Sequence, residues 1–156
     1  EEAFRHFPDS RFNLELKAPG LGLIDTTLEL VAKHRREAIT LLTAGDDGIM
    51  KRLRGRLGGL ATPIAQGASE RDIHEFLGCA AAGTKAPPGP MALQIPPEFG
   101  GQPLVNAALI EFAHARGVQA HVWTINDPAE MRRLLDLGAD GIITDYPGRL
   151  AEVIGE

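Results

Sequence analysis

The chain is poor in the features that staple a protein covalently or anchor it in lipid. Its 156 residues include one cysteine, Cys79, which excludes an intrachain disulfide and a thiolate-rich zinc site. No apolar run approaches the roughly 18 to 20 residues that a membrane-spanning helix needs. The first residues do not follow a signal-peptide pattern, which favours the cytoplasm without fixing the compartment. We expect no membrane span.

Positive charge is also scarce. Sixteen Lys and Arg residues face 21 Asp and Glu residues, which gives a formal net charge of −5. Nucleic-acid binding without sequence preference depends on a basic surface, so this balance disfavours it. The chain contains 44% hydrophobic and 24% charged residues, as ordinary globular proteins do. We expect one domain over residues 1–156.

A strand pattern followed by a helix pattern recurs six times. The predicted strands are Phe12–Leu16, Ile39–Thr43, Leu60–Pro63, Met91–Ile95, Ala120–Ile125 and Gly141–Thr144. The helices that follow them are Asp25–Arg36, Asp46–Arg56, Ser69–Ala82, Leu104–Arg116, Pro128–Leu137 and Arg149–Ile154. Such alternation predicts an α/β fold with a parallel sheet and helical crossovers.

Helix-capping residues support these boundaries. Asp127 is suited to cap a helix whose first residue is Pro128, and Gly138 suits a left-handed exit. Ser69 with Asp72 repeats the start signal. The proline-rich stretch Ala86–Pro103 leaves only Met91–Ile95 as a strand, since proline cannot serve a central ladder position.

Six units do not close a barrel. An eight-stranded (β/α) barrel takes about 250 residues, so this chain is about two units short. The segment Glu1–Phe7 resembles the last turns of an amphipathic helix, and we expect that an N-terminal portion is missing. The strands Phe12–Leu16 and Gly141–Thr144 would then expose unpaired edges, which predicts self-association or partial disorder.

Two charged residues alternate with leucines in the first strand. Because side chains alternate along a strand, Glu15 and Lys17 share one face, and Leu14 and Leu16 share the other, which helices would cover. Enzymes with βα units place catalytic groups near the carboxyl ends of strands, where a buried opposite pair needs a functional reason. An edge strand with a solvated polar face explains the pattern equally well.

Candidate ligand contacts also follow the last two strands. Trp123, the only tryptophan, would face the barrel side near a strand exit, either as a wall for a ligand or as an ordinary core aromatic. His121 would lie one layer deeper. Asp145 follows an apolar strand and would either take part in a site or cap the next helix.

Other patterns are less informative. The basic run of Lys51, Arg52, Arg54 and Arg56 falls at the end of a predicted helix, where cations suit the macrodipole and a solvated face is the simpler explanation. Ser10 and Ser69 lack the neighbours that a serine hydrolase needs.

Three segments carry a resemblance. The sequences NLELK at Asn13–Lys17, HVWTIN at His121–Asn126 and LGADGIITDYP at Leu137–Pro147 resemble the glycerophosphodiester phosphodiesterase family in order and spacing, and LQIP at Leu93–Pro96 fits as well. The resemblance implies a (β/α)₈ barrel of the TIM type, of which this chain would supply units three to eight. It also implies metal-dependent hydrolysis of a small glycerophosphodiester to an alcohol and glycerol 3-phosphate.

The resemblance further implies roles for individual residues. Glu15 matches a ligand of the catalytic metal, Ca²⁺ or Mg²⁺, and Lys17 matches a lysine near the phosphate. Trp123 matches a tryptophan beside the glycerol site, and Asp145 is a further candidate for substrate contact. The hard cation prefers carboxylate oxygen, while the ammonium group offsets phosphate charge.

Several residues of the family pattern have no counterpart in this sequence. These are the two histidines that act as general acid and base and two further metal-binding carboxylates. We therefore expect little or no turnover by this chain alone.

Two alternatives differ in class. A non-catalytic remnant of the barrel would bind a phosphoester or a partner without cleaving it. A different phosphate-binding barrel, such as a sugar-phosphate isomerase, fits less well because Thr144, Asp145 and Tyr146 replace the small residues that grip phosphate there. The enzyme interpretation depends on Glu15, Lys17 and Trp123 converging at the rim where the parallel strands end.

Overall fold

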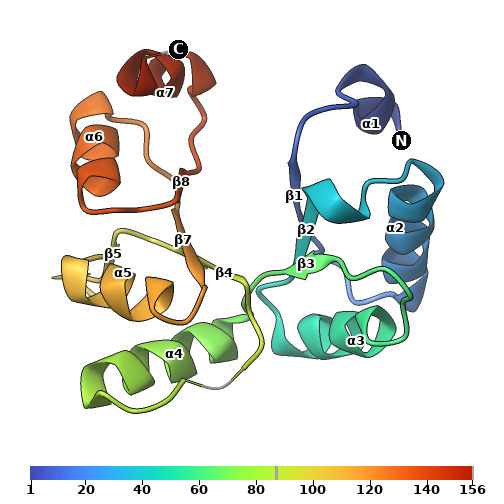
Figure 1. Cartoon of the computed structure of the whole chain (residues 1–156), viewed down its shortest axis with the longest axis horizontal. Helices are drawn as coiled ribbons and strands as arrows, with labels where there is room; N and C mark the ends of the chain where they lie inside the picture. The colour runs from blue at the N-terminus through green and yellow to red at the C-terminus, as the bar shows by residue number, and fades with distance from the viewer. Residues whose placement is uncertain (87, 156) are drawn as a thin grey trace. The chain divides into compact units, whose positions relative to one another are not determined.

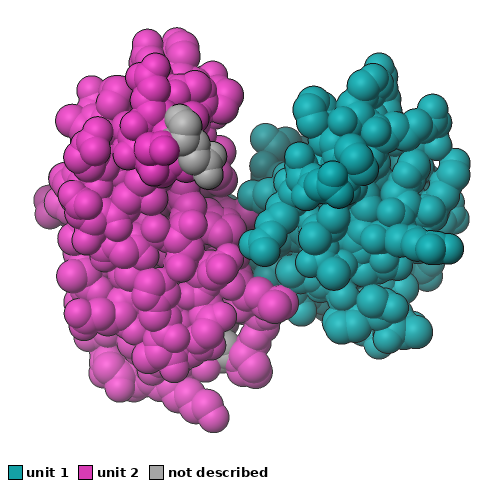
Figure 2. Space-filling view, turned by 45° about the horizontal axis from the view of Figure 1, so that its top comes forward, with its two compact units in different colours: residues 1–72 teal, residues 73–156 magenta. Residues whose placement is uncertain are grey.

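The computed structural model describes residues 1–86 and 88–155 and divides the chain into two compact units, residues 1–72 and residues 73–156 (Figures 1 and 2). Each unit is described by itself. Pro87, within the predicted loop Ala86–Pro103, lies outside the described residues. The single domain expected over residues 1–156 stays a prediction.

Unit 1 contains three parallel strands in the order β1-β2-β3. Its elements are α1 (Glu2–His6), β1 (Phe12–Glu15), α2 (Leu21–Lys33), the 3₁₀ helix η1 (Glu37–Ile39), β2 (Thr40–Thr43), α3 (Asp47–Leu57), β3 (Ala65–Gln66) and the start of α4 (Glu70–Ala82). The ladder pairs Glu15 with Thr43, so the carboxyl ends of β1 and β2 coincide. The strand Phe12–Leu16 is therefore at a sheet edge within its unit, as predicted.

Unit 2 contains a second parallel sheet in the order β4-β7-β8. After α4 come β4 (Ala92–Ile95), β5 (Glu98–Phe99), β6 (Gln102–Pro103), α5 (Ala107–His114), β7 (Gln119–Val122), α6 (Pro128–Asp136), β8 (Gly141–Ile142) and α7 (Pro147–Ile154). The described strands form no closed barrel. The described residues contain six strand–helix units, as predicted, although the third strand lies at Ala65–Gln66, and each crossover helix follows its strand (Figure 1).

Burial follows the predicted alternation. In β7, Ala120 and Val122 are fully buried, while His121 between them is half-buried. Leu16 is 5% exposed and packs in the core of unit 1 with Ile24, Val31 and Leu42. Helices therefore cover one face of each sheet and leave the other face of the same strands for polar side chains.

Two predicted assignments are wrong, one of a strand and one of a loop. Leu60–Pro63 is not a strand: Leu60 N donates to Leu57 O and continues the end of α3, while β3 begins later, at Ala65. Pro63 has no N–H for a ladder. The stretch after Ile95 is not only loop, because β5 and β6 pair as a hairpin that turns through Gly100 and Gly101 at positive φ.

Several helix limits also differ from the prediction. The helix α2 begins at Leu21 and ends at Lys33, and α5 spans only Ala107–His114, because the Asn106 side chain caps it by accepting from Leu109 N at 3.0 Å. The predicted cap at Asp127 is confirmed, since its carboxylate accepts from Glu130 N at 2.9 Å.

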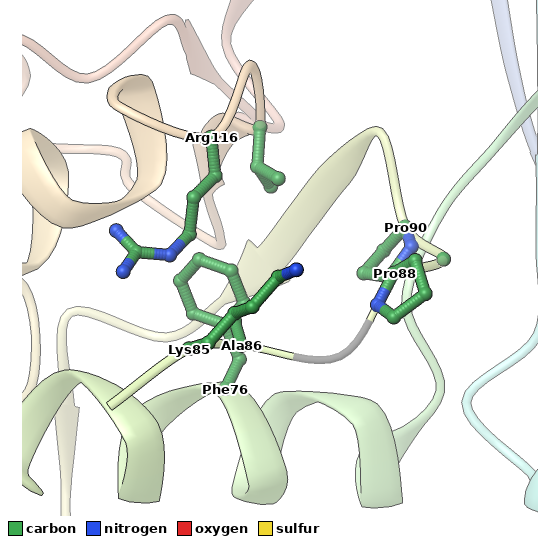
Figure 3. A pocket seen from close by; sticks show the side chains of 8 residues that line it. Phe76, Lys85, Ala86, Pro88, Pro90 and Arg116 are labelled. Atoms are coloured by element: carbon green, nitrogen blue, oxygen red, sulfur yellow. The ribbon is translucent and has the colours of Figure 1, made fainter.

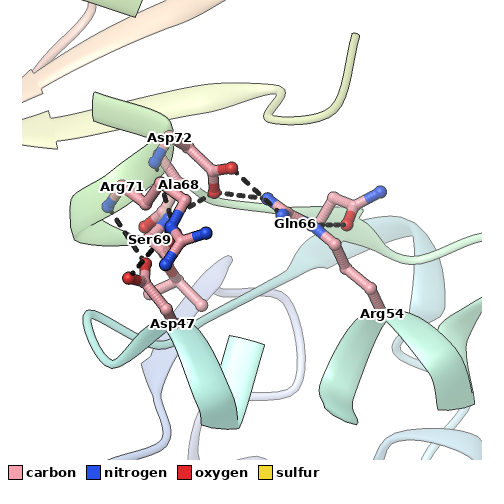
Figure 4. Close-up of polar contacts among 8 residues, drawn as sticks. Asp47, Arg54, Gln66, Ala68, Ser69, Arg71 and Asp72 are labelled. Atoms are coloured by element: carbon pink, nitrogen blue, oxygen red, sulfur yellow. Dashed lines mark hydrogen bonds and ion pairs between the residues drawn. The ribbon is translucent and has the colours of Figure 1, made fainter. Parts of the chain in front are cut away.

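An ionic cluster joins α3, which follows β2, to the start of α4, which follows β3 (Figure 4). Arg54 of α3 donates from both Nη atoms to the Asp72 carboxylate, at 3.1 and 2.5 Å. Ser69 N donates to the same carboxylate at 2.6 Å, and Asp72 N donates to Ser69 Oγ at 3.3 Å, which confirms the predicted capping pair. Asp47 at the start of α3 accepts from Arg71 N at 3.0 Å. These contacts fix the entry of α4.

The charges of this cluster alter its acid–base behaviour. Burial by itself would raise the pKa of Asp72, but hydrogen bonds from Arg54 and from Ser69 outweigh it and hold the pKa below its ordinary value of 3.8. A hydrogen bond from the Ser69 side chain likewise lowers the pKa of Asp47. Both carboxylates are therefore ionised at neutral pH.

Candidate active site

Glu15 and Lys17 lie together where β1 ends. Glu15 is the last residue of β1, and Lys17 Nζ lies 3.2 Å from Glu15 Oε2. Leu16 between them turns into the core and anchors the strand end through a hydrogen bond from its N–H to Thr43 O at 2.8 Å. The alternation predicted from the sequence is thereby confirmed for these residues.

The two interpretations of this pair differ in its burial, and the structure shows the exposed one. The Glu15 and Lys17 side chains are 46% and 79% exposed, because β1 is an edge strand of unit 1 and the described strands do not close around its polar face. In this unit the pair has the solvated environment that was the alternative interpretation. An exposed pair is weakly coupled, so both groups are available to a ligand.

The turn after β2 approaches the same carboxylate. A Cβ atom placed at Gly45 would lie 3.6 Å from Glu15 Oε1, an ordinary van der Waals distance. Glu70 N donates to Gly45 O at 2.9 Å and ties this turn to the start of α4. The ends of β1, β2 and β3 in unit 1 thus present one acidic and one basic group beside a tethered turn.

A divalent metal does not fit the residues of this chain alone. Within the described ranges, no group of three or more His, Cys, Asp or Glu side chains is placed to ligate one ion. Glu15 contributes a single carboxylate, and its nearest cation is Lys17. A hard divalent cation normally takes several oxygen ligands, so Glu15 by itself is insufficient.

Trp123 lies just beyond the end of β7. Its backbone N–H donates to Ile95 O at 3.0 Å, which holds the residue beside the end of β4, and its side chain is 42% exposed. It is therefore not an ordinary core aromatic in unit 2. A half-exposed indole at a strand end offers an apolar surface and one N–H donor.

His121 lies one layer deeper, facing Gly141 of β8. A Cβ atom at Gly141 would lie 3.0 Å from the His121 ring, so the absence of a side chain there makes room for the imidazole. Burial lowers the pKa of His121, although the nearby Asp140 charge acts in the opposite direction. The ring is consequently neutral at pH 7.

Asn126 cross-links the loops that follow β7 and β8. Its Oδ1 accepts from Thr144 Oγ1 at 2.9 Å and from Asp145 N at 3.0 Å, and its Nδ2 donates to Asp145 Oδ2 at 2.9 Å. Its main-chain oxygen accepts from Arg149 at 3.0 Å. The side chain thus uses both donor and acceptor to fix Asp145.

The capping role considered for Asp145 is not observed. The N-cap of α7 is Tyr146, without a capping side chain, and the Asp145 carboxylate instead contacts Asn126. The guanidinium of Arg149 stacks 4.0 Å from the centroid of the Tyr146 ring. Asp145 and Arg149 therefore form an ordered polar rim beside the exposed Tyr146.

The structure brings some predicted site residues together and extends the set. It joins Glu15 with Lys17 in unit 1, and Asp145 with Asn126 in unit 2. Sequence reasoning missed Asn126 and Arg149; the only available signal was the position of Asn126 after a strand exit. The convergence of Glu15 and Lys17 with Trp123 joins two units and stays a prediction.

Comparison with known proteins gives concordant matches. Residues 65–149 match the sequence model of the "Glycerophosphoryl diester phosphodiesterase family". A curated relative from Mycobacterium tuberculosis, named "Probable glycerophosphodiester phosphodiesterase 2", is 29% identical over 99% of this chain and 58% of its own length.

Solved structures agree on the fold. A glycerophosphodiester phosphodiesterase from Agrobacterium tumefaciens superposes with a TM-score of 0.68 at 16% identity, covering 99% of this chain and 60% of that one. An Oleispira antarctica phosphodiesterase, solved with the product sn-glycerol-3-phosphate, gives 0.66 at 22% identity, covering 99% and 59%. The predicted barrel class is confirmed, and the chain spans about three fifths of the length of these relatives.

Proposed function

Because the chain belongs to the glycerophosphoryl diester phosphodiesterase family, we propose that it is the C-terminal portion of a barrel that hydrolyses glycerophosphodiesters to an alcohol and glycerol 3-phosphate. The observation that carries this proposal is the paired Glu15 and Lys17 at the end of β1. Charged groups at the carboxyl ends of parallel strands are where barrel enzymes carry out their chemistry. The product named for the Oleispira structure supports the proposed substrate class.

In this proposal Lys17 offsets the charge of the phosphodiester. Its ammonium group is exposed and its one carboxylate contact, with Glu15, is weak enough to exchange for phosphate oxygen. Trp123 would cover the glycerol carbons, and Asp145, held by Asn126, would accept a hydrogen bond from a substrate hydroxyl. These roles require the convergence of Lys17 with Trp123 that the sequence predicts.

We propose that metal dependence belongs to the longer protein. Glu15 would be the one ligand for Ca²⁺ or Mg²⁺ that this chain supplies, and no step of hydrolysis is assigned to the chain by itself. We expect that the isolated 156 residues do not turn over, and the described part of the chain contains no group of three metal ligands. For the isolated chain, the proposal is binding of a phosphoester without cleavage.

The test separates binding from hydrolysis. The purified chain is titrated with sn-glycerol 3-phosphate by calorimetry, and its activity on glycerophosphocholine is assayed with Ca²⁺ or Mg²⁺. We expect weak binding, no hydrolysis, and a loss of about threefold in affinity for Lys17→Gln. Lys51→Gln, an exposed cation on α3, is the matched control and should bind as the wild type does.

Two results would contradict the proposal. Efficient hydrolysis by the 156 residues would show that the catalytic groups have been misplaced. Equal affinity of the wild type and Lys17→Gln would remove the assigned role of the β1 end.

A further inference from the structure

Unit 2 contains a cavity of about 400 Å³ that none of the proposed site residues line (Figure 3). Its walls include Phe76 of α4, Lys85, Ala86 and Pro90 from the segment after α4, and Arg116 and Val118 from the turn before β7. Pockets that hold small molecules in proteins have about 300 to 1,000 Å³, so this cavity is large enough for one.

The cavity lies at the opposite end of the strands from Trp123. Pro90 and Val118 come just before β4 and β7, whereas Trp123 comes just after β7. A strand of four residues is about 13 Å long. A ligand in the cavity would therefore be bound at the amino ends of the strands, away from the residues proposed for hydrolysis.

The floor of the cavity is apolar and fixed. Phe76, Val118 and Ala86 are only 2%, 7% and 8% exposed. The Phe76 ring also packs edge-on against Phe112 at 5.2 Å between centroids. Such a floor is preformed and suits the flat or aliphatic body of a ligand.

Two cations border this floor. The guanidinium of Arg116 stacks 3.3 Å from the Phe112 ring centroid and donates to Phe112 O at 2.9 Å and to Thr84 O at 3.4 Å. Figure 3 shows the Lys85 side chain extending past Phe76 toward Pro88 and Pro90. The carbonyl contacts orient Arg116 but leave its charge in place.

Neither cation is neutralised by a carboxylate of the described residues. No carboxylate among residues 1–86 and 88–155 forms an ion pair with Lys85 or Arg116. In a chain with a net charge of −5, two unpaired cations beside one apolar cavity select for an anion. Cations on an open surface without an apolar cavity beside them would not select for an organic anion.

We propose that this cavity binds a small organic anion, a phosphate monoester or a carboxylate with an aromatic or aliphatic body. The apolar body lies on Phe76 and Val118, the anionic group faces Lys85, and Arg116 adds positive charge at the border of the cavity. The proposal does not depend on the hydrolytic function. It assigns a second ligand site to the amino-terminal end of the unit 2 sheet.

Calorimetry with phenyl phosphate as the probe tests this site. The titrations use the Lys17→Gln form of the full chain, in which anion binding at the end of β1 is weakened, and binding to the cavity is identified by its loss in the Lys85→Gln variant. We expect phenyl phosphate to bind about tenfold more tightly than inorganic phosphate, because the ring is buried on the floor. Lys85→Gln should weaken phenyl phosphate binding by about threefold, and Lys85→Gln with Arg116→Gln by about tenfold.

The controls make the test decisive. Arg132 is an exposed cation of α6 in the same unit, and Arg132→Gln should leave the affinity unchanged. If Arg116→Gln unfolds the chain, the exposed Lys85 still provides the comparison. The proposal is overturned if phenyl phosphate and inorganic phosphate bind alike, if no binding is detected at millimolar concentration, or if Arg132→Gln weakens binding as much as Lys85→Gln.

Discussion

The two units use different chemistry to join the segments that follow neighbouring parallel strands. In unit 1 the helices α3 and α4, which follow β2 and β3, are joined by charges, chiefly Arg54 on Asp72. In unit 2 the loops after β7 and β8 are joined by one neutral side chain, Asn126. The first arrangement depends on ionisation and salt, while the second depends on the geometry of one amide.

Breaking the ion pair between Arg54 and Asp72 should cause the largest loss of stability. Arg54→Met leaves the partly buried Asp72 carboxylate without its bidentate partner, and we expect the free energy of unfolding to fall by about 2 kcal/mol in urea titrations. Lys51→Met on the same helix is exposed and should change stability little.

The pH dependence of the free energy of unfolding provides a second test of Arg54→Met. The pKa of Asp72 is lower in the folded state than its unfolded value of 3.8. The ionised carboxylate therefore stabilises the fold fully above pH 3.8, and this stabilisation is lost as the pH falls through the folded pKa. The difference between wild type and Arg54→Met should therefore shrink as the pH is lowered from 5 toward 2. A difference that is constant over this range would show that the ion pair is not its source.

Replacing the Asn126 amide should cause an intermediate loss of stability. Asn126→Asp replaces the Nδ2 donor by an oxygen that faces Asp145 Oδ2, and the repulsion should cost about 1 kcal/mol in thermal unfolding. The exchange Asn126→Asp with Asp145→Asn restores one amide and one carboxylate. It should recover most of the loss, whereas additive losses would contradict the cross-link.

The exposed pair of Asp47 and Arg71 should contribute least to stability. Asp47 accepts from Arg71 N and lies near Arg71 Nε at 3.5 Å. Asp47→Asn should shift the melting temperature less than either change above, and 1 M NaCl should abolish the shift because an exposed pair is screened. A shift that survives high salt would instead point to its hydrogen bond with the backbone.

The order of elements was predictable from the sequence because it depends on local signals. Asp127 capping α6, and Ser69 with Asp72 starting α4, are short-range patterns that the structure confirms. The position of β3 was not predictable in this way. The segment Leu60–Pro63 contains apolar residues, but Leu60 is 39% exposed, and the buried side chain there is Ile64, which reaches the core of unit 1.

The candidate site was predictable only residue by residue. Alternation placed Glu15 and Lys17 on one face, but their exposure depends on what lies beside an edge strand, which alternation does not report. The contact of Asn126 with Asp145 joins positions 19 residues apart in sequence. Such contacts arise from the ladder between β7 and β8, and neither residue type identifies its partner.

The hairpin of β5 and β6 affects which sequences and lengths the connection between β4 and α5 can accept. Its two strands pair with each other, and its turn uses Gly100 and Gly101, so its backbone requirements are met locally. It projects Phe99, which is 67% exposed, from the connection between β4 and α5. This connection is therefore a place where length and sequence can vary, or a foreign peptide be grafted, while the neighbouring ladder keeps its register.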